Sequence, residues 1–192
     1  MNTGKLILNT VLVIGVFALS FLLYKSIEEP ITVDNVRKKR QPAAHERLLE
    51  IKKAQMAYLE AHGHFTGDFD SLIYSIMHDS VPEIKIVGNP DLLEEDSTAV
   101  VVYDTAYVSL LVKTFNDPNY SLDSLRYVPY TGGKVFNLKA AYIEELGRKI
   151  PVFEVSVTEK ELLFDQVQKY VSQDQVWKVG SLQEARYDGN WE

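Results

Sequence analysis

The chain has 192 residues, of which 46% are hydrophobic and 24% are charged, and this composition is typical of one folded domain with an accessory segment. Because it contains no cysteine, disulfides, thiolate metal sites and a cysteine nucleophile are excluded. The formal net charge of -7 at pH 7 makes nucleic acid an unfavourable partner, since most of the surface repels phosphate groups.

An apolar segment, residues 6–24, dominates the N-terminus. It reads LILNTVLVIGVFALSFLLY, carries no charge and lies between Lys5 and Lys25. With a rise of about 1.5 Å per residue, a helix of this length crosses a hydrocarbon core of about 30 Å. A cleaved signal peptide is the alternative, but its apolar region is usually about 7–15 residues long and ends at an A-x-A-like site, which this segment lacks. We therefore predict an uncleaved anchor that binds the membrane through residues 6–24.

Some positions in this anchor are candidates for contact with lipid or with a partner helix: Leu12, Val13, Val16 and Phe17. Gly15, Ala18 and Ser20 do not form a GxxxG motif, so the sequence does not predict dimerisation within the membrane.

A polar connector, residues 26–41, follows the anchor. We expect Pro30 to stop the membrane helix, because proline lacks an N–H group and crowds the preceding turn. This divides the chain into an anchor at 1–25, a hinged connector at 26–41 and a head domain at 42–192. The basic block Arg37–Arg40 is either a solvated helix face or a clamp on anionic lipid headgroups.

A helix is predicted from about Pro42 to His62. Its apolar residues recur at steps of three and four, as on one helix face: Ala44, Leu48, Ile51, Ala54, Tyr58 and Ala61. We expect Gly63 to end this helix, since glycine takes the left-handed conformation without a Cβ penalty. A second helix is predicted after the N-cap Asp68, with an apolar side made of Phe69, Leu72, Ile73, Ile76 and Met77.

Two histidines at this corner suggest an alternative, a zinc site made by His62, His64, Asp68 and Asp70. A structural explanation exists for three of them, because His62 suits a helix C-terminus, Asp68 an N-cap and Asp70 a first turn. No third histidine or glutamate follows at ligand spacing, so we predict no metal site.

The rest of the chain, after the second predicted helix, contains more patterns that are typical of β-strands. Strands are predicted at Glu83–Val87, Ala99–Tyr103, Leu125–Tyr130, Lys134–Ile143 and Ile150–Val157, whereas Ala106–Phe115 fits either a helix or a strand. Thr131–Gly133 and Glu145–Lys149 are predicted turns. Thr158 and Glu161 form a capping box for a C-terminal helix, with Leu162, Leu163, Val167 and Tyr170 on its buried side. We expect Trp177 and Trp191 to pack against the head.

The inventory of catalytic motifs is short. A G-x-S-x-G elbow, a phosphate loop and H-E-x-x-H are all missing, and Thr131–Lys134 is only a fragment of a phosphate loop, placed between strands. The acidic groups Glu94–Asp96 and Glu144–Glu145 lack the ligand pattern of a calcium loop. We therefore predict no catalytic residue, no cofactor, no metal and no small-molecule substrate.

Several phrases carry a resemblance to known proteins: the exit Glu29-Pro30-Ile31, RLLEIKKAQMAYLEAHGHFTGDFDSLI, LRYVPY, IPVFEVSV and the end KVGSLQEARYDGNWE. With the N-terminal span, they resemble a family of uncharacterised membrane-anchored proteins of Bacteroidota over nearly the whole chain. The resemblance implies a membrane-anchored architecture in the cell envelope. It does not imply a particular reaction. It favours a single-pass protein of the inner membrane with its head in the periplasm. The opposite orientation stays open, because Lys5 alone precedes the span while Lys25 and the basic block follow it.

The chain is also similar to pilins and type II secretion pseudopilins, which join an apolar N-terminal helix to a head of helices and β-strands. Their A-x-x-x-Y-x-x-x-x-G-like helix end matches at Ala54, Tyr58 and Gly63. The chain departs from them because it lacks the leader cleavage site and the glutamate that follows it, and because Pro30 is expected to interrupt the helix.

These patterns predict an α+β protein with an N-terminal transmembrane helix followed by helices packed on an antiparallel β-sheet. We expect a structural or protein-interaction role in the envelope without catalysis. Two alternatives remain: a pseudopilin-like subunit of a secretion or fibre machine, and a hydrolase with unrecognised carboxylates in a deep pocket.

Overall fold

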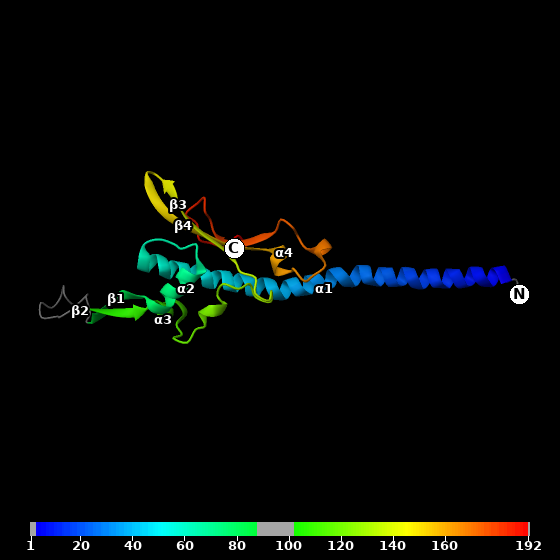
Figure 1. The fold of residues 1–192 in the computed structure, drawn as a ribbon, viewed down its shortest axis with the longest axis horizontal. Coiled ribbons are helices and arrows are strands. Elements are labelled where there is room, and N and C mark those ends of the chain that lie inside the picture. Colours follow the sequence, from blue (N-terminus) through cyan, green and yellow to red (C-terminus); the bar gives the residue numbers. More distant parts are fainter. Residues whose placement is uncertain (1–2, 88–101, 192) are drawn as a thin grey trace, which may run out of the picture.

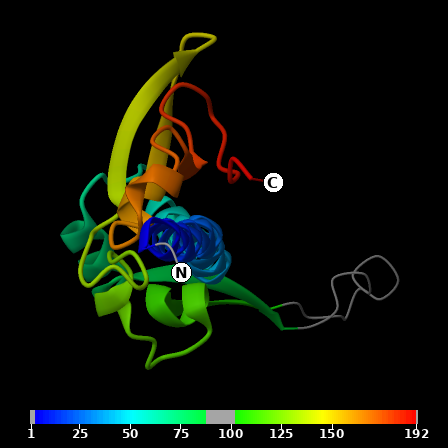
Figure 2. The same cartoon turned by 90° about the vertical axis from the view of Figure 1, so that its right-hand side faces the viewer.

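The computed structural model describes residues 3–87 and 102–191, and its longest element is the helix α1, Thr3–His62. The N-terminal half of α1 projects from the molecule as a bare helix (Figure 1). Its C-terminal half is packed against a head made by the other elements, which lie above, below and to the left of the helix when the molecule is seen along it (Figure 2). The α+β class, with a long N-terminal helix, short helices and antiparallel strands, is confirmed.

Helix α1 does not stop at the connector, so the expected hinge is wrong. Pro30 and Pro42 both lie inside the helix. A proline in a helix removes one backbone hydrogen bond and crowds the preceding turn, at a cost of about 3 kcal/mol. This penalty is local, and beyond Pro30 the head holds α1 from Val33 onward. Contacts far along the chain, in the C-terminal part of the head, therefore keep the segment helical.

The first helical corner is as predicted. Gly63 has a φ of 73°, and its N–H donates to the carbonyl of Leu59 (2.7 Å), which closes the last turn of α1. Helix α2, Phe69–His78, begins after Asp68, whose carboxylate accepts the N–H of Ser71 at 2.8 Å. Local signals alone thus position both helix ends.

Two antiparallel strands, β1 (Ser80–Val87) and β2 (Val102–Ser109), form a ribbon with Ser80 opposite Ser109. Helix α3, Leu110–Phe115, follows at once, so the ambiguous segment 106–115 divides between a strand and a helix. Of the strand predicted at 99–103, residues 99–101 lie outside the described residues, as do the acidic residues 94–96.

A second sheet has the strand order β3-β4-β5, with β3 at Asn137–Glu145, β4 at Arg148–Thr158 and β5 at Val176–Gly180. A two-residue turn of Leu146 and Gly147, with φ values of 51° and 75°, joins β3 to β4. This confirms the predicted hairpin at 145–149.

The predicted strand at 125–130 is wrong. This segment forms turns after the short 3-10 helix η2, Leu122–Ser124, with one isolated bridge between Tyr127 and Val135. Leu125 and Val128 are both buried, and their spacing of three residues suits a turn instead of the alternation of a strand.

The chain between β4 and β5 holds two short helices, α4 (Glu159–Leu162) and the 3-10 helix η3 (Gln168–Tyr170). The capping box of Thr158 and Glu161 is confirmed, since each side chain binds the other residue's backbone N–H. The helix is shorter than expected, and Val167 is exposed and not buried.

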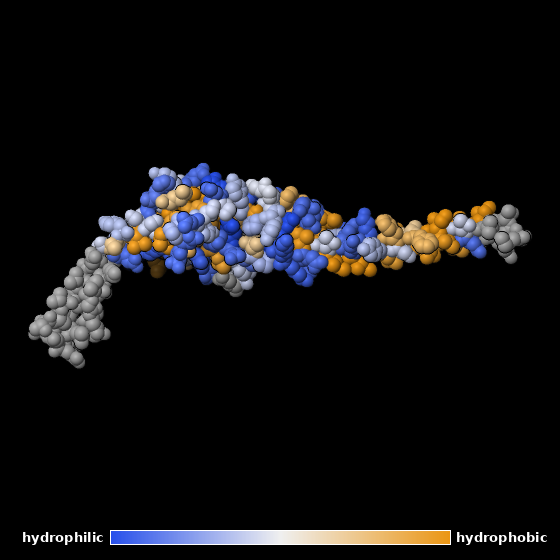
Figure 3. Space-filling view, turned by 90° about the horizontal axis from the view of Figure 1, so that it is seen from below, coloured by the Kyte–Doolittle hydropathy of each residue, from blue (hydrophilic) through white to orange (hydrophobic). Residues whose placement is uncertain are grey.

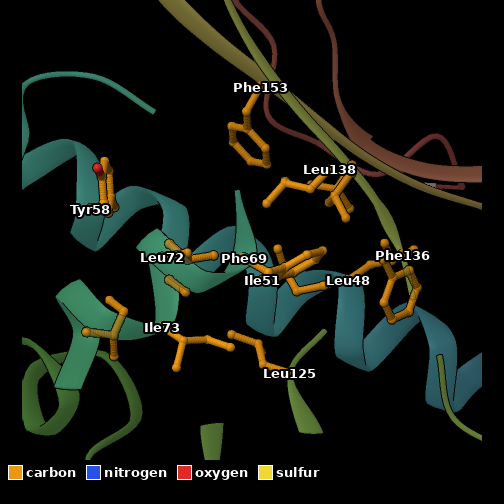
Figure 4. Close-up of a cluster of buried hydrophobic side chains, with 14 of the residues drawn as sticks. Leu48, Ile51, Tyr58, Phe69, Leu72, Ile73, Leu125, Phe136, Leu138 and Phe153 are labelled. Atoms are coloured by element: carbon orange, nitrogen blue, oxygen red, sulfur yellow. The ribbon is translucent and has the colours of Figure 1, made fainter. Parts of the chain in front are cut away.

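The core forms between α1, α2 and the three-stranded sheet, where Figure 4 shows Leu138 and Phe153 facing the α1 and α2 side chains. Five of the six residues predicted on the apolar face of α1 are buried: Ala44, Leu48, Ile51, Ala54 and Tyr58. Gln55 is also fully buried, and its amide exchanges hydrogen bonds of 2.6 and 3.2 Å with the backbone of Thr66. These bonds fix the loop between α1 and α2.

Candidate functional site

The projecting half of α1 contains the apolar segment 6–24. Its described large apolar side chains between Val11 and Tyr24 are 54% to 72% exposed, so the head covers none of them. In the part of the chain that the structure describes, this is the one helix long and apolar enough to cross a membrane. Hydrophobic residues line the projecting half, whereas hydrophilic residues cover most of the visible face of the head (Figure 3). An exposed apolar surface of this extent marks contact with lipid or protein.

Among its described side chains, no face of the projecting helix is more buried than the others in a way that would mark it as a contact surface. The candidate contact residues Leu12, Val13, Val16 and Phe17 are all exposed. At Gly15, an added Cβ would meet no atom within 4 Å, so open space surrounds this side of the helix too.

The junction between the projecting helix and the head begins at Val33, which is buried with Leu163 and Val171. Two turns further along α1, Arg40 binds both carboxylate oxygens of Asp165, at 2.8 and 2.7 Å. The hydrogen bond from Arg40 lowers the pKa of Asp165 to about 2. Arg40 thus holds α1 against the loop that follows α4.

A buried carboxylate completes the junction. The side chain of Glu159, the first residue of α4, is 4% exposed and forms an ion pair with Arg37. Arg37 also donates to the carbonyl of Tyr170 at 3.0 Å, and the N–H of Ser172 donates to Glu159 at 3.2 Å. A charge with this little solvent requires such partners.

The basic block of residues 37–40 is therefore split by the fold. Its two arginines bind carboxylates of the head, so neither a solvated face nor a lipid clamp describes them. Lys38 pairs with Asp34 on α1 at 2.7 Å, and the ammonium of Lys39 lies 5.2 Å from the centre of the Tyr130 ring. Both lysines remain exposed.

The suspected zinc ligands have separate partners. His62 Nε2 lies 3.0 Å from Asp79, and His64 Nδ1 lies 3.1 Å from the carbonyl of Phe65. Asp68 caps α2, and Asp70 forms an ion pair with Arg126 on the loop after η2. Among residues 3–87 and 102–191, no group of three or more histidines and carboxylates lies close enough to hold a metal ion.

Ser75, His62 and Asp79 meet beside an open groove of about 480 Å³ at the end of α1. In a catalytic triad, the serine and the aspartate bind different nitrogens of the imidazole. Here both bind Nε2, at 2.9 and 3.0 Å, and the Ser75 hydroxyl also donates to Asp79 at 2.5 Å. Ser75 lines this groove but is only 3% exposed, and its hydroxyl is bound by both His62 and Asp79. The cluster joins the last turns of α1 and α2.

A larger groove of about 680 Å³ lies between α1 and α3. It is open to solvent, and its lining includes Leu49, Met56 and Ala57. Across its rim, Lys113 of α3 binds Glu60 of α1 at 2.6 Å.

The remaining candidate loops have structural roles. The Thr131 hydroxyl donates to the carbonyl of Val128 at 2.7 Å and accepts the N–H of Lys134 at 3.2 Å, so it closes its own turn. Glu144 and Glu145 are exposed beside the β3–β4 turn.

Sequence reasoning missed the residues that hold the junction. Arg37 and Glu159 are separated by 122 positions, and nothing local pairs them. Glu159 lies directly after the predicted cap Thr158, but a glutamate in a first helical turn usually faces solvent. Their role therefore becomes visible only in the fold.

No protein-family model, no curated protein and no solved structure matches the chain.

Proposed function

We propose that this protein is a single-pass membrane protein of the cell envelope, in which α1 is both the anchor and the supporting stem of a head that binds other proteins. Residues 6–24 cross the inner membrane, and the head lies in the periplasm. The role is structural or interaction-based, without catalysis.

The observation that carries this proposal is the division of α1 into two different surfaces. One continuous helix is apolar and exposed in its first half and is packed into a core in its second half. In water, such an exposed apolar surface is unfavourable by about 25 cal/mol for each square ångström. A lipid bilayer removes this penalty, and the continuous helix satisfies its backbone groups within the hydrocarbon core.

Alkaline carbonate extraction of membranes tests the anchor. The full-length chain is expected to stay in the membrane pellet. The variant Leu12→Lys/Val16→Lys is expected to be extracted, because each charge near the centre of a span costs about 3 kcal/mol. The matched control, Met56→Lys/Tyr107→Lys, adds the same charges at exposed positions of the head and should remain in the pellet. An intact native chain in the supernatant would contradict the proposal.

Orientation is tested separately with a reporter fused after Glu192. We expect activity of a reporter that folds only in the periplasm and silence of one that requires the cytoplasm. The reverse pattern would follow the count of basic residues and place the head in the cytoplasm.

A second candidate function, a pseudopilin-like subunit, is favoured by the continuity of α1. The expected break at Pro30 argued against lateral packing of the helices, and α1 has no such break. Because the chain has no cysteine, a cysteine introduced at Gly15 can be crosslinked between copies in native membranes. Crosslinked ladders longer than dimers would support a subunit that assembles with copies of itself, whereas monomers alone would oppose it.

A further inference from the structure

The end of the head that faces the projecting helix has a surface on which lysines lie beside aromatic rings. It consists of the loop around η3 and the turn at 130–134, and Figure 1 shows η3 at the end of the head nearest the bare half of α1. We call this surface the head base. It contains three pairs of a lysine and an aromatic ring: Lys39 with Tyr130, Lys134 with Phe164, and Lys169 with Tyr170.

Each lysine of the head base lies over a ring. The ammonium groups are 5.2, 4.7 and 5.2 Å from the ring centres, in the order of the pairs above. Within the described residues, none of these three lysines forms an ion pair with a carboxylate. Tyr130 and Phe164 are more than 40% exposed, so apolar ring surface and positive charge reach solvent together.

The two arginines near the head base do not compete with its lysines for an external anion. Arg37 and Arg40 are held by Glu159 and Asp165, so their charges are compensated inside the head. The positive charge available to an external anion therefore belongs to the lysines, in a chain whose net charge is -7.

The position of the head base is fixed relative to the apolar segment by one helix. From Tyr24, the last apolar residue of the segment, to Lys39, the head-base lysine that α1 itself carries, α1 rises by about 22 Å. The headgroup layer extends about 5–8 Å beyond the hydrocarbon core on each side. A helix tilt of about 20°, which is average for a span, lowers one side of the head further.

Proteins use lysines and exposed aromatic rings together to bind the membrane interface. The ring lies at the level of the headgroups, and the ammonium binds anionic phosphates. Attraction to an anionic surface acts over about one Debye length, near 10 Å at 0.1 M salt.

We propose that the head base binds the anionic lipid headgroups of the membrane that α1 spans, so that the head leans on the bilayer with the side formed by 130–134 and η3. This inference rests on the proposed anchor. It adds a second, reversible membrane contact and fixes which face of the head is turned away from the lipid.

The test uses the full-length chain in vesicles and a single fluorophore. The chain has no cysteine, so Val167→Cys, at an exposed position beside η3, takes one label in the head base. Quenching by lipids that carry a nitroxide on the headgroup reports contact. The same label at Leu146→Cys, on the turn between β3 and β4, is the control for a distant position.

We expect strong quenching at position 167 in mixed phosphatidylglycerol and phosphatidylcholine vesicles, and weak quenching in phosphatidylcholine alone or at high salt. Each lysine near an anionic surface changes the contact equilibrium by about fivefold. The variant Lys39→Gln/Lys134→Gln/Lys169→Gln should therefore lose the effect of anionic lipid. The matched control, Lys53→Gln/Lys139→Gln/Lys149→Gln, removes the same charge from other exposed positions of the head and should keep it.

The outcomes separate this inference from the anchor. Carbonate-resistant protein whose label at 167 is no more quenched in anionic vesicles than in neutral ones overturns the lipid contact and leaves the anchor standing. Equal loss of quenching in both triple variants also overturns it, since net charge alone would then explain the result. Protein that is extracted by carbonate overturns both.

Discussion

Arg37, in the stretch of α1 that the sequence marks as a connector, binds the buried carboxylate of Glu159 in the C-terminal part of the head. The two residues are separated by 122 positions, and their ion pair ties the supporting helix to α4. With the contact of Val33, it makes the head and the projecting helix a continuous structure.

Removal of Arg37 tests this junction. Arg37→Ala should lower the free energy of unfolding of the head by about 3 kcal/mol, because Glu159 is left as an uncompensated buried charge. The measurement is denaturant unfolding of the full chain in mild detergent, followed by tryptophan fluorescence. Adding Glu159→Gln to Arg37→Ala removes that charge and should restore more than half of the loss. Equal stability of the single and double variants would show that the pair does not hold the junction.

The pair of Arg40 and Asp165 predicts a pH dependence. The hydrogen bond from Arg40 lowers the pKa of Asp165 from 3.8 to about 2, so its stabilising effect is complete above pH 4. It should be lost as the pH falls from about 4 to 2, because the unfolded chain then binds the proton first. The pair is partly exposed, so the effect is limited to about 1 kcal/mol.

A double-mutant cycle isolates this effect. The coupling between Arg40→Gln and Asp165→Asn, measured by unfolding at pH 7, should fall toward zero near pH 2. A coupling free energy that does not change between pH 7 and pH 2 would mean that protonation of Asp165 is not linked to unfolding.

Local signals in the sequence located several elements correctly. Gly63, Asp68 and the Thr158–Glu161 box act on neighbouring backbone groups, so a few residues suffice to predict them. The connector failed because Pro30 is a local signal for a break, while the contacts that keep the helix continuous come from residues far away in sequence. The head base was out of reach for the same reason, since its three pairs bring together α1, the turn at 130–134 and the segment after α4.

The cluster at the end of α1 predicts an order of pKa shifts. The pKa of Asp79 lies below its usual value, and the largest single cause is the hydrogen bond that the Ser75 hydroxyl donates to it, ahead of the hydrogen bond with His62. Ser75→Ala should therefore raise the pKa of Asp79 more than His62→Ala does. Carboxyl carbon NMR titration measures both shifts. The opposite order would make His62 the main partner of Asp79.

The turn between β3 and β4 predicts a stabilising substitution. Leu146 is 98% exposed and has a φ of 51°, a conformation that costs a residue with a Cβ about 1–2 kcal/mol. Leu146→Gly should raise the free energy of unfolding by about 1 kcal/mol, less the added freedom of the unfolded chain. The matched change Gly147→Ala, at a φ of 75°, should lower it. Destabilisation by Leu146→Gly would show that the leucine has a partner.

The continuity of α1 across Pro30 is the basis of both proposals, and it predicts a distance. Phe21 and Lys38 are both exposed, and each can be replaced with a cysteine that carries a spin label. The two positions are separated by 17 residues of helix, which corresponds to about 25 Å of rise. Pulsed electron resonance of the full chain in nanodiscs should give one narrow distance distribution. Pro30→Ala should leave its centre unchanged, because the helix already passes through this position.

A flexible control defines what a hinge would look like in the same measurement. Replacing residues 28–31 with glycines should broaden the distribution and shorten its mean, since glycine disfavours the helix by about 1 kcal/mol per residue. If the native chain gave the same broad distribution as this variant, the head would be hinged at Pro30. Residues 3–62 would then not act as one rod, and the height of the head base above the bilayer would no longer be fixed by α1.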